Sequence, residues 1–115
     1  MLKARVLFDS SVEDLLGWKC CNISGMNLEV QVKNEGDSPI VIKGAMTFSG
    51  EGGETTISNM YPYGGGRIEA GDSLAFYCSA DEKEMSGADR LVLEDGNGVR
   101  YEAKITGAFE EAERL

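Results

Sequence analysis

The sequence predicts an all-β protein, an antiparallel β-sandwich of about seven strands. Apolar and polar residues alternate with a period of two along several segments, turn residues separate these segments at intervals of about 8–12 residues, and helical periodicity is scarce. The chain has 115 residues, the usual length of one domain. We expect residues 1–107 to form a single sandwich domain and residues 108–115 to form an acidic C-terminal tail.

Eight segments are expected as strands. Leu28, Val30 and Val32 share one face of the second segment, and the residues between them are polar or charged. This pattern is typical of a strand with one buried side. The longer expected strands are Leu2–Phe8, Asn27–Asn34, Pro39–Ser49, Ser73–Ser79, Asp89–Glu94 and Gly98–Ile105, and the shorter ones are Thr55–Ser58 and Arg67–Glu69.

Turn and helix signals lie between and beyond these strands. The segment Asp95–Gly98 carries an Asn-Gly step, which predicts a hairpin joining the last two long strands as an antiparallel pair. Ser10–Gly17 has an N-cap residue, acidic residues and a terminal glycine, so we expect a short helical turn near residues 11–16. A second helix is conceivable over Ala108–Leu115, but this segment is too short to be helical unless it docks, and a frayed tail is the simpler expectation.

Charge and composition exclude several function classes. Twenty acidic against eleven basic residues give a net charge of -9, which disfavours binding to nucleic acid. The chain has no histidine, so it lacks the base of a Ser-His-Asp or Cys-His nucleophile and every histidine ligand for zinc. We therefore expect no enzyme activity, no catalytic residues and no cofactor. No apolar run reaches the roughly 18–20 residues of a membrane helix, so we expect no membrane contact and a cytoplasmic protein, or an extracytoplasmic one if the chain is a processed fragment.

The chain has three cysteines, Cys20, Cys21 and Cys78. They could form a redox pair or a bridge from Cys78 to Cys20 or Cys21, but the odd number excludes a complete disulfide framework. Free cysteine behaves as a small buried hydrophobe, and this interpretation is favoured.

No metal site is expected. The segment Asp95–Gly98 superficially resembles a calcium loop, but aligning its last glycine with the loop glycine places Leu93 and Lys104 where acidic ligands are required. The acidic residues at 81–84 and the pair Glu51 and Glu54 are interpreted as solvated loop charges.

The candidate binding residues are Met60, Tyr61 and Tyr63, in a loop that also contains proline and three successive glycines. Tyrosine supplies a large amphipathic contact area at low entropic cost, which is typical of adaptable binding surfaces. The alternative is that a tyrosine folds back to cap the end of the sandwich.

Three segments carry a family resemblance. Leu28–Ile42, Ile68–Phe76 and Leu93–Tyr101 resemble, in order, the strand and turn motifs of immunoglobulin-like β-sandwich domains in bacterial proteins. The resemblance covers roughly residues 26–105 and implies an immunoglobulin-like architecture, but it implies no activity because such sandwiches have many roles. The antibody-type pair of cysteines with a tryptophan between them is absent.

A second, partial resemblance is to PilZ-type cyclic-dinucleotide receptors, through Asn22–Asn27. That family also needs an upstream Arg-x-x-x-Arg, whereas here Arg5 is followed four residues later by Asp9.

Taken together, these observations favour a non-catalytic protein-interaction or structural module with a protein partner or self-association. The alternative is a receptor for a small ligand, a nucleotide or a metal.

Overall fold

The computed structural model describes residues 1–8, 26–85 and 87–115. The helical turn expected near residues 11–16, both Cys20 and Cys21, and most of the segment Asn22–Asn27 lie outside the described residues. The one helix in the described part is too short to cross a membrane. The elements of this part are β1 (Leu2–Phe8), β2 (Leu28–Asn34), β3 (Ile40–Ile42), β4 (Met46–Gly50), β5 (Gly53–Ile57), β6 (Gly66–Ile68), β7 (Ser73–Cys78), α1 (Glu82–Met85), β8 (Ala88–Glu94), β9 (Arg100–Lys104) and β10 (Glu110–Arg114).

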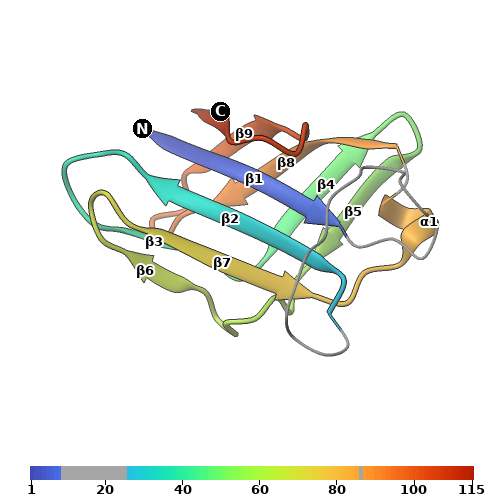
Figure 1. Cartoon of the computed structure of the whole chain (residues 1–115), viewed down its shortest axis with the longest axis horizontal. Coiled ribbons are helices and arrows are strands. Elements are labelled where there is room, and N and C mark those ends of the chain that lie inside the picture. Colours follow the sequence, from blue (N-terminus) through green and yellow to red (C-terminus); the bar gives the residue numbers. More distant parts are fainter. Residues whose placement is uncertain (9–25, 86) are drawn as a thin grey trace.

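Eight of these strands form one antiparallel sheet in the order β5-β4-β8-β9-β10-β1-β2-β7. Strands β3 and β6 form a second, two-stranded sheet. Figure 1 shows that the large sheet curls, so that β1, β2 and β7 lie across β4 and β8. The prediction of an all-β fold is confirmed, but the described chain contains ten strands rather than about seven.

The register of the large sheet gathers its apolar residues on one face. Val6, Val30 and Phe76 lie side by side on β1, β2 and β7, and all three are buried. Phe48 and Leu91 are paired in the same way on β4 and β8, and both are also buried. A sheet with one apolar face must cover that face, and curling brings its two halves together over a common core.

The predicted hairpin is confirmed, because β8 and β9 are antiparallel partners with Glu94 opposite Arg100. The amide of Asp95 also donates to the carbonyl of Val99 at 2.9 Å. The Asn-Gly step therefore marks the turn that the sequence indicated.

The prediction of one strand over Pro39–Ser49 is wrong, because this range is divided between two sheets. Strand β3 pairs with β6 and β4 pairs with β8, and Gly44 lies at the change. A Cβ atom on Gly44 would lie only 3.0 Å from the Gly65 nitrogen and 3.2 Å from the Met60 carbonyl oxygen. The close backbone approach at this glycine explains why the chain can change sheets there.

The C-terminal segment is a strand rather than a tail or a helix. Strand β10 lies between β9 and β1 in the large sheet, with Ala112 opposite Leu2 and Glu111 opposite Lys3. Ala112 is buried and Glu111 is exposed, which is the alternation of a strand with one covered face. Two strand edges would otherwise be left open, and their backbone hydrogen bonds stabilise this segment.

The substitution Ala112→Asp tests whether β10 belongs to the sheet. Placing an unpaired carboxylate at this buried position should lower the free energy of unfolding by about 3 kcal/mol or more. The exposed neighbour gives the control, because Glu111→Asp should change it by less than about 0.5 kcal/mol. Urea denaturation measures both variants, and equal stabilities would show that the segment is a tail.

Candidate functional site

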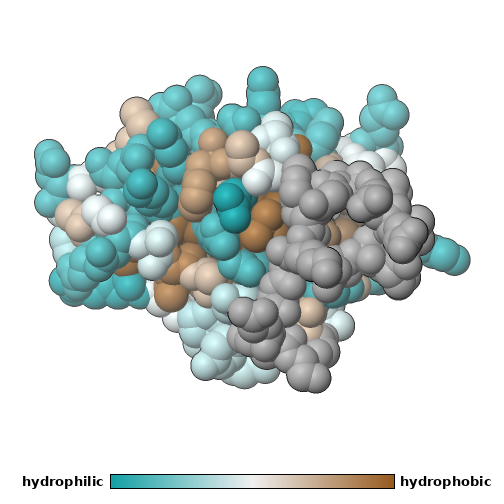
Figure 2. All heavy atoms as spheres, viewed as in Figure 1, coloured by the Kyte–Doolittle hydropathy of each residue, from teal (hydrophilic) through white to brown (hydrophobic). Residues whose placement is uncertain are grey.

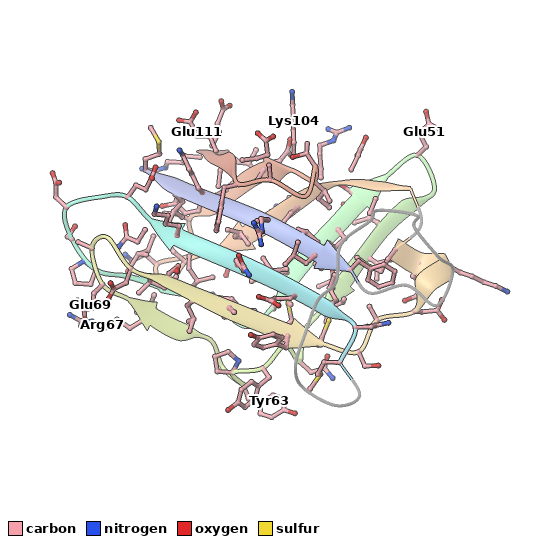
Figure 3. All side chains as sticks on the ribbon, viewed as in Figure 1. Glu51, Tyr63, Arg67, Glu69, Lys104 and Glu111 are labelled. Carbon is pink, nitrogen blue, oxygen red and sulfur yellow. The ribbon has the colours of Figure 1, made fainter. Side chains whose placement is uncertain are left out.

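The predicted binding residues lie between β5 and β6, and the structure separates them into two groups. Met60 is completely buried in the core, so it cannot contact a partner. Tyr61 is 48% exposed and Tyr63 is 71% exposed. Neither tyrosine is buried as a cap on the sandwich, and Figure 3 shows Tyr63 projecting from the lower side of the molecule.

The two tyrosine rings contact each other. Their centroids are 5.6 Å apart and the rings are nearly perpendicular, at 88°. This edge-to-face geometry is the one favoured by the charge distribution of aromatic rings. The two side chains form a single aromatic surface, called the tyrosine pair below.

Backbone hydrogen bonds fix the segment that carries the tyrosine pair. The Tyr61 amide donates to the Tyr77 carbonyl and the Tyr77 amide donates to the Tyr61 carbonyl, both at 2.7 Å. On the other side, the Met60 amide donates to the Gly44 carbonyl at 3.1 Å. The segment is therefore bonded to the edge strand β7 and to Gly44, two residues before β4. A surface held in this way loses little conformational entropy when a partner binds.

Glycine is required at one position of this loop. Gly65 has a φ of +93°, and a Cβ atom there would collide with the carbonyl oxygen of Ile42. Gly64 also has a positive φ, of +81°, but a Cβ atom on it would meet open space. Gly65 therefore allows β3 and the loop to pack closely, whereas Gly64 only forms the turn.

The segment that carries the tyrosine pair is uncharged. Residues 55–66 contain no Asp, Glu, Lys or Arg, although charged residues make up 27% of the chain. The net charge of -9 is therefore carried by the rest of the molecule. A neutral, aromatic area on a charged protein has the composition found at the centre of protein–protein interfaces.

Asp95 is a buried carboxylate in the β8–β9 turn, and its hydrogen bonds stabilise that turn. Its Oδ1 atom accepts hydrogen bonds from the Asn97 and Val99 amides, each at 2.9 Å. The Tyr101 hydroxyl donates to Oδ2 at 3.2 Å. Burial and this bond to Asp95 raise the pKa of Tyr101. The carboxylate organises the hairpin, in agreement with the interpretation of this segment as a turn.

A cavity of about 600 Å³ opens beside this turn. Asn34, Asp95, Tyr101 and Arg114 are among its lining residues. Asn34 is buried, and its side chain donates to the Ser38 and Ile68 carbonyls and accepts from the Gly36 amide. Asn34 and Asp95, the two buried polar side chains of the cavity, therefore use their hydrogen bonds to stabilise turns.

The outer face of β1, β2 and β7 carries a second polar cluster, on the side of β2 that alternation predicted to be polar. Glu29 is buried there and accepts a hydrogen bond of 2.6 Å from the Gln31 amide group. Burial, and the charge of Glu29, raise the pKa of the neighbouring Tyr77. Figure 2 shows this face, on which hydrophilic side chains near the centre lie between hydrophobic areas.

Cys78 carries a free thiol that is only 3% exposed. Burial raises its pKa from 9.0 to about 11. A protonated, inaccessible thiol is a poor nucleophile, so Cys78 is a core residue.

The acidic loop residues show no metal-binding geometry within the described residues, where no group of three or more Cys, Asp or Glu side chains could hold an ion. Asp81 instead accepts hydrogen bonds from the amides of Lys83 and Glu84 at the start of α1.

Comparison of the chain with protein-family models, curated proteins and solved structures gives no match. The chemistry of the tyrosine pair is therefore the basis for the function proposed below.

The glycine requirement gives a matched pair of substitutions. Gly65→Ala should lower the free energy of unfolding by roughly 2–4 kcal/mol, because the methyl group collides with backbone in a left-handed conformation. Gly64→Ala should cost only about 1 kcal/mol, since it meets no atoms. Denaturant unfolding of both variants measures the difference, and equal losses would contradict the close packing at Gly65.

The raised pKa of the buried Cys78 thiol should lower the stability of the protein at alkaline pH. Below pH 9 the thiol is protonated in both states, but between pH 9 and about 11 it ionises only when unfolded. Relative to Cys78→Ala, the wild type should lose about 2–3 kcal/mol over this range, because one pKa unit is worth about 1.4 kcal/mol. Unfolding at a series of pH values measures this difference, in which the shifts of Tyr77 and Tyr101 cancel. Parallel pH profiles of the two proteins would contradict a buried thiol.

Proposed function

We propose that this protein is a non-catalytic protein-interaction module that contacts its partner through the tyrosine pair. The observation that carries the proposal is that Tyr61 and Tyr63 are exposed although the backbone that leads into them is hydrogen-bonded, at Met60 to Gly44 and at Tyr61 to Tyr77. Exposed aromatic rings gain free energy when a partner removes them from water, and a fixed segment retains most of that gain. Tyrosine is also among the residues that contribute most to binding at interfaces.

The uncharged segment around the tyrosine pair favours a partner with an apolar or cationic contact group. An apolar side chain can pack against the rings, and an arginine guanidinium can lie over a ring face. The acidic remainder of the chain, with a net charge of -9, would attract a basic partner from a distance. We expect the first contact to be steered by charge and the affinity to come from the tyrosines.

The chemistry of the remaining residues supports a role without catalysis. The chain has no histidine, Cys78 is buried and protonated, and Asp95 is engaged in its turn. A free cysteine in the core is typical of a reducing compartment, which supports placing the protein in the cytoplasm.

We also infer that the architecture is that of an immunoglobulin-like sandwich. Strands β1, β2 and β7 are neighbours in the order of strands A, B and E of that fold. Strands β5, β4, β8 and β9 follow the order C′, C, F and G. Strand β10 then joins the two layers along one side, between β9 and β1.

A second candidate function is the binding of a small ligand, and the cavity of about 600 Å³ near Asp95 supports it. A ligand that binds only the folded protein raises its melting temperature. A thermal-shift screen with nucleotides and divalent metals would favour this function if a shift is abolished by Arg114→Ala. No shift with any compound would leave the interaction module as the better account.

The substitution of both tyrosines tests the proposed function. The variant Tyr61→Ala/Tyr63→Ala should lose retention of a partner in an affinity pull-down from the native host's lysate. Against that partner once purified, its affinity should fall by at least about tenfold, since central interface tyrosines commonly contribute this much. Its melting temperature should stay close to that of the wild type, because both side chains are exposed.

Phe109→Ala is the control, because Phe109 is also a partly exposed aromatic residue, 37% accessible, and it packs against Arg5 away from the tyrosine pair. This variant should bind the partner as the wild type does. Equal binding by the wild type and the double variant, with both folded, would overturn the proposed surface.

A further inference from the structure

The two edge strands of the large sheet, β7 and β5, differ in their hydrogen bonding. The edge at β7 is engaged by the Tyr61 backbone through two hydrogen bonds to Tyr77. At the other edge, no strand of the described ranges pairs with the outer side of β5. Gly53, Glu54 and Thr56 are exposed on this strand. An open edge presents backbone donors and acceptors to any strand that can reach them.

The hairpin between β4 and β5 determines which backbone groups point outward. Gly50 and Gly53 are opposite each other across a two-residue turn, and such a closing pair is hydrogen-bonded. Alternate pairs along the hairpin are then also bonded, so the amides of Thr55 and Ile57 point toward β4. The amides and carbonyls of Glu54 and Thr56 point away from β4, into the open edge.

This edge lacks the features that usually prevent strand pairing. It contains no lysine, no proline and no bulge in its pairing with β4, and Glu54 is its one charged residue. Thr55, Thr56 and Ile57 are β-branched, which favours an extended strand. Ser58 and Asn59, which continue the chain beyond β5, are also exposed and uncharged.

We infer that β5 pairs with β5 of a second copy of this chain, antiparallel and about a two-fold axis at Thr56. In this register Thr56 lies opposite its own copy, and Glu54 lies opposite the uncharged Ser58 of the other copy. Thr55 lies opposite Ile57, so β-branched residues meet on the inner face. The pairing joins the two eight-stranded sheets into one continuous sheet.

The sequence of the edge favours a second copy over an unrelated peptide. The register keeps the two Glu54 carboxylates far from each other, at opposite ends of the paired segment. The rest of β5 is neutral, and the charged residues Lys83 and Glu84 of α1 line a hollow with the first residues of β5, Gly53 to Thr55, rather than with Thr56 at the axis. Because long-range repulsion between the copies is screened by salt, association should be stronger at high ionic strength.

Thr56→Pro is the sharpest test. Proline removes an amide that points into the open edge, so it blocks pairing without breaking the β4–β5 ladder. Sedimentation of the full chain should give a monomer–dimer equilibrium for the wild type. For the proline variant the association constant should fall at least about tenfold, because that amide is used twice across the axis.

Two further variants separate pairing from folding. Thr56→Val loses the same contact to the Thr47 hydroxyl, which is 3.0 Å away, but it keeps the amide and should associate as the wild type does. Thr56→Glu places two carboxylates opposite each other at the axis, so its association should be weak in low salt and should recover partly in high salt. Thermal denaturation verifies that each variant is folded.

Hydrogen exchange identifies the surface directly. As protein concentration rises, exchange should slow at the amides of Glu54, Thr56 and Ser58, while the amides of Thr55 and Ile57 keep a constant rate. A wild type that stays monomeric at every concentration and salt level would overturn the inference. So would a dimer that Thr56→Pro leaves intact, including one that Tyr61→Ala/Tyr63→Ala disrupts instead.

Discussion

The structure depends on burying one apolar face that extends across eight paired strands. Alternate pairs of the register place one buried side chain beside another, from Phe48 and Leu91 on one half to Val30 and Phe76 on the other. Flat, this face would be open to water, and the hydrophobic effect makes that state unfavourable. The sheet therefore curls until its two halves share a core, and every other feature of the molecule accommodates that curvature.

The chain between β5 and β6 connects the two halves of the curled sheet. Its backbone bonds to Gly44 on one side and to Tyr77 on the other, and the side chain of Met60 fills the core beneath it. The backbone of Tyr61 makes these contacts, whereas the side chains of Tyr61 and Tyr63 remain on the surface. The chain leaves β5 through this segment, and no strand of the described residues pairs with the outer edge of β5.

Much of the fold could be predicted from the alternation of residues, because burial on one face imposes a period of two. Strand β1 matches its predicted range, and the Asn-Gly turn gave the β8–β9 hairpin. The division of Pro39–Ser49 could not be seen in this way, since Ile42 and Met46 keep the same parity across the break; Gly44 was the available signal. Strand β10 was missed because Glu-rich segments have low strand propensity, and only its place between β9 and β1 stabilises it. For the site, Tyr61 and Tyr63 were identified by residue type, whereas the burial of Met60 and the bonds to Tyr77 depend on contacts between distant segments.

The central claim is that the tyrosine pair is held on a segment as rigid as the sheet it closes. Native-state hydrogen exchange at the Tyr61 and Tyr77 amides tests this most directly, because each donates to the other residue's carbonyl at 2.7 Å. The account predicts that both amides exchange as slowly as those of the central strands, opening only when the whole domain unfolds. Exchange at Tyr61 as fast as at the exposed Asn59 would contradict it, and would show that the tyrosines belong to a mobile loop instead of a preformed surface.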